Sequence, residues 1–145
     1  MVAVMVTRGL PGRNSVSQPL SWSVPDDAVV VAIPPNAAHF RMLRLAAAVV
    51  AADLLDIASI EDSQIGLEEA ASLLLDADPN SRIEATLWCS DGLLHVRVQS
   101  NIGAVPSDPL GEGFRRTILE AVTDDLRVAH DEVTGTTAVL FTKTS

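Results

Sequence analysis

The sequence contains few aromatic and few basic residues. There is no Tyr, and Trp and Phe together make up 3% of the chain. Lys and Arg number 10 against 19 acidic residues, which gives a formal net charge of −9. Nucleic-acid binding relies on basic surfaces that pair with phosphates and on aromatic rings that stack on bases. The composition therefore argues against nucleic acid as a direct ligand and favours a basic protein as partner.

Cysteine is also scarce. Cys89 is the single cysteine, which excludes an internal disulfide and a multi-cysteine metal site. Its strand-like surroundings predict a buried structural thiol. His39, His95 and His130 show no metal-ligand spacing with one another, and His95 is interpreted as a solvated or edge residue of a strand.

Long apolar runs are absent. The longest uncharged one, Leu45–Ala52, has eight residues, whereas a membrane span needs ~18. Residues 1–10 do not have the pattern of a signal peptide, because Arg8 follows the apolar part. We therefore expect a cytoplasmic protein that does not insert into a membrane.

Length and composition predict one globular domain. The chain has 145 residues, of which 48% are hydrophobic and 20% charged, enough for a sizeable core. Residues 1–25 are rich in Gly, Pro, Ser and Asn, and we expect a flexible N-terminal tail there, with room for one short strand. Residues 26–145 are expected to form the domain.

Three helices are predicted from apolar residues that recur every three to four positions. They are expected at Asn36–Leu55, Ser59–Asp78 and Asp108–Thr123, with Asn36 and Ser59 as N-caps. The run Leu45–Ala52 is apolar almost all round, which indicates a helix buried on two sides, either in the core or at an interface. The core is the favoured interpretation. Residues from all three helices are expected to be buried together: Val50, Leu67, Leu74, Phe114 and Ile118.

Strands are predicted between the helices. Ala28–Ile33 is β-branched and ends at two prolines, and Arg82–Cys89 and Leu93–Gln99 flank Asp91-Gly92, a strong hairpin turn signal. Two further strands are expected at Leu126–Ala129 and Thr136–Thr142. This order predicts an α+β fold, a two-layer sandwich with a mixed or antiparallel sheet and three helices on one face.

Motifs at both ends of the domain resemble one family. Near the C-terminal end, residues 118–126 (ILEAVTDDL) and 135–140 (GTTAVL) are similar to two segments of the anti-sigma factor serine/threonine kinases, which have the histidine-kinase-like (Bergerat, GHKL) ATPase fold. Asn36 and Arg41 match an N-x-x-x-x-R arrangement in that family's first helix. The resemblance implies that Asn36, Arg41 and the nearby Arg44 contact a sigma factor and an anti-anti-sigma (STAS-type) protein. It also implies a homodimer.

The nucleotide motifs of that family are altered. When Glu69-Ala70 is placed on the family's E-A-x-x-N-x-x-x-H motif, Leu73 takes the position of the Mg²⁺-binding Asn, and Ala77 takes that of the His. Glu69 is then a vestigial catalytic residue. Asn101-Ile102-Gly103 corresponds to D-x-G, and Gly111-Glu112-Gly113 to the glycine pair at the phosphates. The resemblance thus assigns weak ATP or ADP binding, without an intact Mg²⁺ site, to Asn101, Gly103, Gly111, Gly113 and Thr137.

Three interpretations of function remain open. The first, which we favour, is a regulatory protein that sequesters a sigma factor and has lost kinase chemistry, since Leu73 has no oxygen with which to bind Mg²⁺. The second is an active ATP-dependent kinase that phosphorylates an anti-anti-sigma protein. The third is an α+β domain with another role, because similarity of fold does not by itself specify function.

Overall fold

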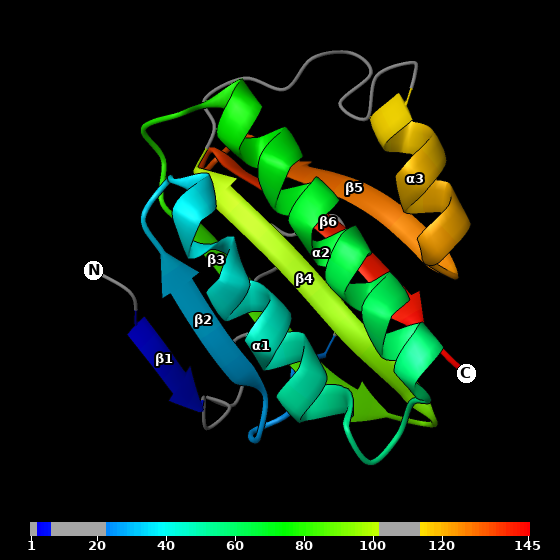
Figure 1. Ribbon diagram of the computed structural model, residues 1–145. Coiled ribbons are helices and arrows are strands. Elements are labelled where there is room, and N and C mark those ends of the chain that lie inside the picture. The colour runs from blue at the N-terminus through cyan, green and yellow to red at the C-terminus, as the bar shows by residue number, and fades with distance from the viewer. Residues whose placement is uncertain (1–2, 7–22, 102–113) are drawn as a thin grey trace.

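The fold is built around a single antiparallel sheet. The computed structural model describes residues 3–6, 23–101 and 114–145. Its sheet has six strands in the order β1-β2-β3-β4-β6-β5, and every neighbouring pair is antiparallel (Figure 1). The strands are β1 (Ala3–Val6), β2 (Val29–Ile33), β3 (Ile83–Ser90), β4 (Leu93–Asn101), β5 (Asp125–Asp131) and β6 (Thr136–Lys143).

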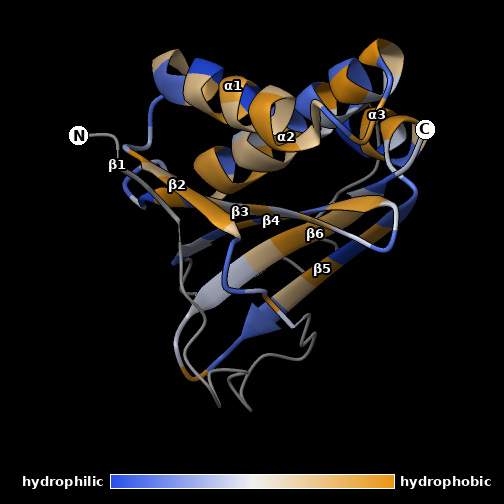
Figure 2. Cartoon of the chain, turned by 90° about the horizontal axis from the view of Figure 1, so that it is seen from below, coloured by the Kyte–Doolittle hydropathy of each residue, from blue (hydrophilic) through white to orange (hydrophobic). Residues whose placement is uncertain are grey.

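The helices lie on one side of this sheet. They are the short 3-10 helix η1 (Ala37–His39), α1 (Phe40–Ala51), α2 (Ile57–Ala77) and α3 (Phe114–Val122). Figure 2 shows α1, α2 and α3 along the same face. The predicted α+β class is therefore confirmed, and the sheet is antiparallel rather than mixed. None of the helices in the described ranges is long and apolar enough to cross a membrane.

Two predicted segments fall partly outside the described residues. The short strand expected in the N-terminal tail is present as β1, which pairs with β2 from Ala3↔Ala32 to Val6↔Val29. Residues 7–22 of the predicted tail lie outside the description. Residues 108–113, the expected first part of the third helix, do so as well, and α3 is described from Phe114.

The β3–β4 hairpin follows the prediction closely. Ser90 pairs with Leu93, and the two residues between them have positive φ, 56° at Asp91 and 78° at Gly92. A two-residue turn with positive φ at both positions matches the right-handed twist of the flanking strands. Gly tolerates that backbone without strain, which is why Asp-Gly was informative in the sequence.

Polar N-caps fix where the first two helices begin. The Asn36 side chain accepts a hydrogen bond from the Ala38 amide at 2.9 Å, as predicted for an N-cap. The prediction of Ser59 as the N-cap of the next helix was wrong, since α2 is capped by Asp56, whose Oδ1 accepts a hydrogen bond from the Ser59 amide at 2.8 Å. Asp and Ser are equally good caps, so residue type alone did not distinguish the two positions.

The core fills the space between the helices and the sheet. Leu67 and Leu74 of α2 are fully buried there, as expected, and Val50 is half-buried. The prediction failed for Phe114 of α3, which is 81% exposed, whereas Ile118 is half-buried and Leu119 is the fully buried residue of that helix. The periodicity of α3 was correct, but its buried face is rotated by about one residue.

The opposite face of the sheet is also buried in part. Trp88 of β3 is 4% exposed and stacks on His95 of β4, with ring centroids 5.1 Å apart. His95 is therefore a half-buried residue of an interior strand, not the solvated or edge residue that was expected.

Cys89 of β3 is exposed rather than buried, which corrects the prediction of a buried thiol. Its thiol donates a hydrogen bond to the carbonyl of Val50 in α1 at 3.3 Å.

Candidate functional site

The residues assigned to nucleotide binding lie at one end of the sheet where they are described. Asn101 is the last residue of β4, and Thr137 is the second of β6. The register pairs Asn101 with Thr136 and Ser100 with Thr137, so the two positions are neighbours across the strands. Gly103, Gly111 and Gly113 lie outside the described residues.

Both polar side chains at this end bind other protein groups. The Thr136 hydroxyl donates to Asn101 Oδ1 at 3.2 Å. Thr137 is 1% exposed, and its hydroxyl is 2.8 Å from His130 Nδ1 on β5. The Asn101 carbonyl also accepts from Ser81 Oγ at 2.5 Å. Ligand binding by Asn101 or Thr137 would therefore compete with hydrogen bonds that already exist.

The α2 positions of the family motif have different environments. Leu73, at the position expected to bind Mg²⁺, is 8% exposed and belongs to the main hydrophobic core. Ala77 ends α2 and is exposed. Glu69 is partly buried, and its carboxylate forms an ion pair with Arg115 of α3, whose Nε lies 3.3 Å from Glu69 Oε2.

Arg115 joins two acidic groups of α2. Besides Glu69, it binds Asp76, with Nη1 2.7 Å from Oδ2. The side chain thus supplies positive charge beside the glutamate, near the place where the resemblance implies a metal. Within residues 3–6, 23–101 and 114–145, no group of three or more His, Cys, Asp or Glu side chains is arranged to hold a metal ion. The ion pairs of Arg115 with Glu69 and Asp76 join α3 to α2 at this place.

Sequence reasoning missed two residues that shape this contact. Arg115 was not singled out, because it lies 39 positions after Asp76. The sequence alone does not show which acids of one helix will face a cation on another. Gly66 was missed although a glycine inside a helical pattern is a signal for close packing. A Cβ at Gly66 would lie 3.2 Å from both Phe141 Cζ and Thr123 Cγ2, so α3 and the sheet approach α2 closely there.

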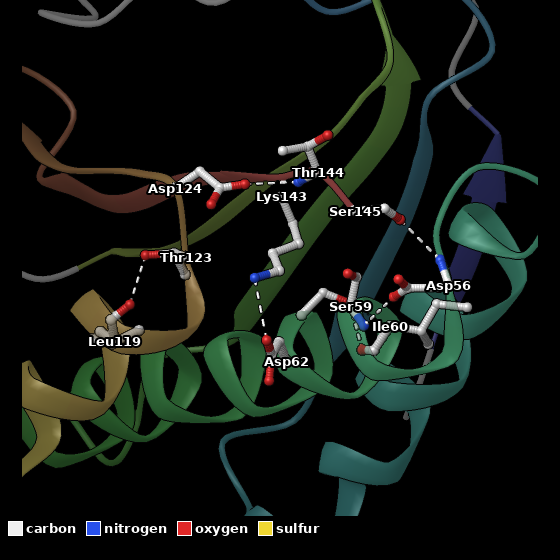
Figure 3. Close-up of polar contacts among 11 residues, drawn as sticks. Asp56, Ser59, Ile60, Asp62, Leu119, Thr123, Asp124, Lys143, Thr144 and Ser145 are labelled. Carbon is white, nitrogen blue, oxygen red and sulfur yellow. Dashed lines mark hydrogen bonds and ion pairs between the residues drawn. The ribbon is translucent and has the colours of Figure 1, made fainter.

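A second polar cluster lies at the other end of α2 (Figure 3). Lys143 Nζ is 3.2 Å from Asp62 Oδ2, and the Lys143 side chain is only 11% exposed. The Asp56 amide donates to Ser145 Oγ at 2.9 Å, and the Thr144 amide donates to Asp124 Oδ2 at 2.7 Å. These contacts hold residues 143–145 against α2 and the start of β5, which is a structural role.

Hydrogen bonds also lower the pKa of Asp56, an acid in this cluster. The side chain and the backbone amide of Ser59 donate to the Asp56 carboxyl, and with Lys143 nearby they hold its pKa below the ordinary value. Hydrogen bonds that favour the carboxylate act in this direction. Because the same carboxylate caps α2, its ionisation is coupled to the stability of that helix end.

The predicted partner-binding residues are found around α1. Asn36 uses its side chain for the η1 cap. Arg44 forms an ion pair with Glu68 of α2. Arg41 is exposed, and the part of the chain that the structure describes offers it no ion pair. Of the three residues, Arg41 is thus the one whose charge is available to another molecule.

The run Leu45–Ala52 does not have the two-sided burial that was favoured from the sequence. Leu43, Ala47 and Ala51 are fully buried, but Leu45 is 57% and Val49 is 68% exposed. One side of α1 packs on the sheet and α2, and the other side presents apolar residues outward. The alternative that was left open, a helix with an apolar face for an interface, fits this arrangement.

Comparison with known protein families and with curated proteins finds no family model and no curated sequence that matches the chain.

Proposed function

We propose that this chain is an anti-sigma-factor-like regulatory protein that binds and sequesters an RNA polymerase sigma factor and is released by an anti-anti-sigma protein of the STAS type. In this proposal the sheet and its helices are a two-layer, Bergerat-type fold whose ATP and kinase site has decayed. The order of elements, with two helices before a central hairpin and one after it, supports the fold. The motifs around Arg41 and at residues 118–140 support the partner class.

The observation that carries the proposal is the environment of Leu73 and Glu69. A buried leucine offers no oxygen to Mg²⁺, and phosphoryl transfer depends on that metal to neutralise phosphate charge. The glutamate beside it is neutralised by Arg115 instead. Both features remove catalytic chemistry while preserving α2 as a packed helix, which is what a binding protein requires.

Arg41 is the residue that we expect to contact the sigma factor. Its guanidinium is exposed on α1, and Arg forms strong, directional hydrogen bonds with carboxylates of a partner. The proposal therefore predicts that charge reversal at this one position weakens binding without unfolding the protein.

Affinity capture from a native lysate tests this prediction. Wild-type protein, Arg41→Glu and the control Arg127→Glu, which reverses an exposed arginine of β5, serve as baits, and the captured proteins are quantified by mass spectrometry. We expect a sigma factor with wild type and with the control, and a loss of about tenfold or more with Arg41→Glu. The melting temperature of Arg41→Glu should agree with that of wild type, whereas Arg127→Glu also breaks the exposed Arg127–Asp125 ion pair, which is expected to lower stability only slightly. Equal capture by all three would remove Arg41 from the interface, and no sigma factor with any bait would refute the proposal.

Calorimetry with ATP, in the presence and absence of Mg²⁺, tests the decay of the nucleotide site. We expect weak binding that Mg²⁺ changes little, and no transfer of phosphate to an anti-anti-sigma protein. Micromolar, Mg²⁺-dependent binding together with a phosphorylated serine on that protein would establish the active kinase instead.

A further inference from the structure

The sheet ends on one side with β5, a strand that has a neighbour along only one of its two edges. It is the last strand in the order β1-β2-β3-β4-β6-β5, and it pairs with β6 alone (Figure 1). Such a strand directs the N–H and C=O groups of every second residue away from its neighbour. Within residues 3–6, 23–101 and 114–145, no backbone group from outside the sheet bonds to residues 125–130. The outer edge of β5 is therefore a row of backbone groups that another strand can pair with.

β5 lacks most of the features with which edge strands avoid further pairing. Such strands are typically short, or are interrupted by a proline or a bulge, or carry a lysine. β5 has seven residues, against four in β1 at the opposite edge of the sheet. Its register with β6 is continuous from Asp125↔Thr142 to Asp131↔Thr136, and its sequence contains neither proline nor lysine. Its length and regularity suit the addition of one more strand.

The side of β5 that faces the helices is apolar and incompletely covered. Leu126 and Val128 are aligned with Phe141 and Val139, two fully buried core residues of β6. Unlike those two, Leu126 and Val128 are only partly buried. A strand beside β5 would remove more of their surface from water, which favours association. The segment that binds here is therefore expected to place apolar residues on the helix side.

The opposite side of β5 and its two ends are acidic. Arg127 forms an ion pair with Asp125, with Nη2 3.1 Å from Oδ2, so its charge is already balanced. Residues 124–132 contain four acids against this one arginine, which gives a net charge of −3 with His130 neutral. A basic segment is the electrostatic complement of this strand.

We propose that an extended, basic segment of a partner protein adds to the sheet along β5, with apolar side chains toward the helices and lysine or arginine on the other side. Its backbone pairs with the outward N–H and C=O groups of β5, which supplies affinity. Its alternating side chains supply selectivity, as in other cases of strand addition. The proposal rests on β5 alone and not on the proposed function, since neither α1 nor the altered nucleotide motifs take part.

A second copy of the chain fits this edge less well than a basic segment does. Two antiparallel β5 strands can pair all seven residues only about a two-fold axis at Val128. That register places Asp125 opposite Asp131 of the partner subunit, and the two-fold axis repeats the contact. Like charges directly opposite each other destabilise a strand pair. The chain's net charge of −9 adds repulsion between copies, whereas it attracts a basic partner.

Three seven-residue peptides test the proposal with the purified full chain at physiological salt. The first alternates lysine and valine, and the second alternates glutamate and valine. The third is the lysine peptide with every backbone amide methylated, so it keeps the charge but cannot donate strand hydrogen bonds. We expect the lysine peptide to bind and to slow amide hydrogen exchange, followed by NMR, at alternate residues of β5 but not in the interior strand β2. The other two peptides should bind about tenfold more weakly or not at all.

A matched pair of charge reversals tests the protein's side of the contact. Glu132→Lys changes an exposed acid at the end of β5, and Asp26→Lys changes an exposed acid just before β2, four strands away in the sheet. Strands ~4.8 Å apart place the second change well beyond the ~8 Å over which charges act at this salt concentration. Glu132→Lys should raise the dissociation constant of the lysine peptide about threefold or more, and Asp26→Lys should leave it nearly unchanged. Circular dichroism confirms that both variants are folded.

Four results would overturn the proposal: no binding of the lysine peptide, equal binding of the methylated one, protection of amides outside β5 alone, or equal effects of the two charge reversals. A dimer of the chain without peptide, with slowed exchange in β5, would make a second copy the occupant instead. No sigma factor is present in these experiments, so their failure is distinct from failure of the proposed function.

Discussion

Replacement of Gly66 by alanine is the most informative test of how α3 is attached. The new Cβ would lie 3.2 Å from Phe141 Cζ and Thr123 Cγ2, and 3.5 Å from Val122 Cγ2. Phe141 is fully buried in the core. Thr123 is held by its hydroxyl, which donates a 2.6 Å hydrogen bond to the Leu119 carbonyl. The two nearest neighbours are therefore fixed and have little room to move away.

Two opposing effects decide the sign of the change in stability. Alanine is favoured over glycine inside a helix by about 0.8–1.0 kcal/mol. An extra carbon forced into a well-packed contact costs about 1–3 kcal/mol. Because the neighbours are fixed, we expect the packing cost to be the larger effect. Gly66→Ala should lower the free energy of unfolding by about 1 kcal/mol, measured by urea denaturation with an unchanged m-value.

A double-mutant cycle separates this packing cost from other causes. Thr123→Ser removes Cγ2 but keeps the hydroxyl that binds the Leu119 carbonyl. In the Gly66→Ala background this second change should recover about 0.5–1 kcal/mol relative to its effect in wild type, because contacting residues are not additive. If Gly66→Ala stabilised the protein, or if Thr123→Ser left its cost unchanged, the close approach of α3 to α2 would not be the reason for glycine here.

Three other predictions address the core, the ion pairs and an acid. Leu74→Ala should cost ~2–5 kcal/mol of unfolding free energy in urea denaturation, because Leu74 is fully buried; an unchanged stability would refute the buried stripe of α2. Arg115→Met should speed amide hydrogen exchange in α3 more than Glu120→Gln does, because Arg115 bridges to Glu69 and Asp76 of α2, whereas Glu120 pairs with Arg116 of α3 itself; equal rates would refute the bridge. The lowered pKa of Asp56 contributes stability above its ordinary pKa of 3.8, and this stability is lost as the pH falls through the lowered value. Asp56→Asn keeps a cap and should show a smaller loss of stability as the pH falls from 5 to 2; an identical loss would exclude this acid as a contributor.

Most secondary structure was predictable because its signals are local. The hairpin around Asp91-Gly92, the N-cap at Asn36 and the end of the second helix near Asp78, just before a proline, each follow from the conformational preferences of a few adjacent residues. The errors were small shifts between equivalent residues. Asp56 caps α2 three positions before the expected Ser59, and either residue type satisfies the same amide groups.

The candidate site was less predictable, because its geometry depends on segments far apart in the chain. The sequence placed Glu69 and Leu73 on one helix, with a leucine at the position where the resemblance implies a metal ligand. It contained no sign that Arg115 would reach Glu69 and Asp76. A cation can satisfy an acid from any direction, so charge pairing across helices leaves no periodic pattern to read.

Local chemistry in the sequence by itself determined the type and order of the elements, the antiparallel hairpin and the α+β class. Only the tertiary structure decided which side of each apolar segment would be covered. Leu119 rather than Phe114 is buried on α3, and Leu45 and Val49 face outward from a helix that is apolar nearly all round. Burial is settled by the position of the neighbouring layer, and a helix with two apolar sides fits against a sheet through either of them.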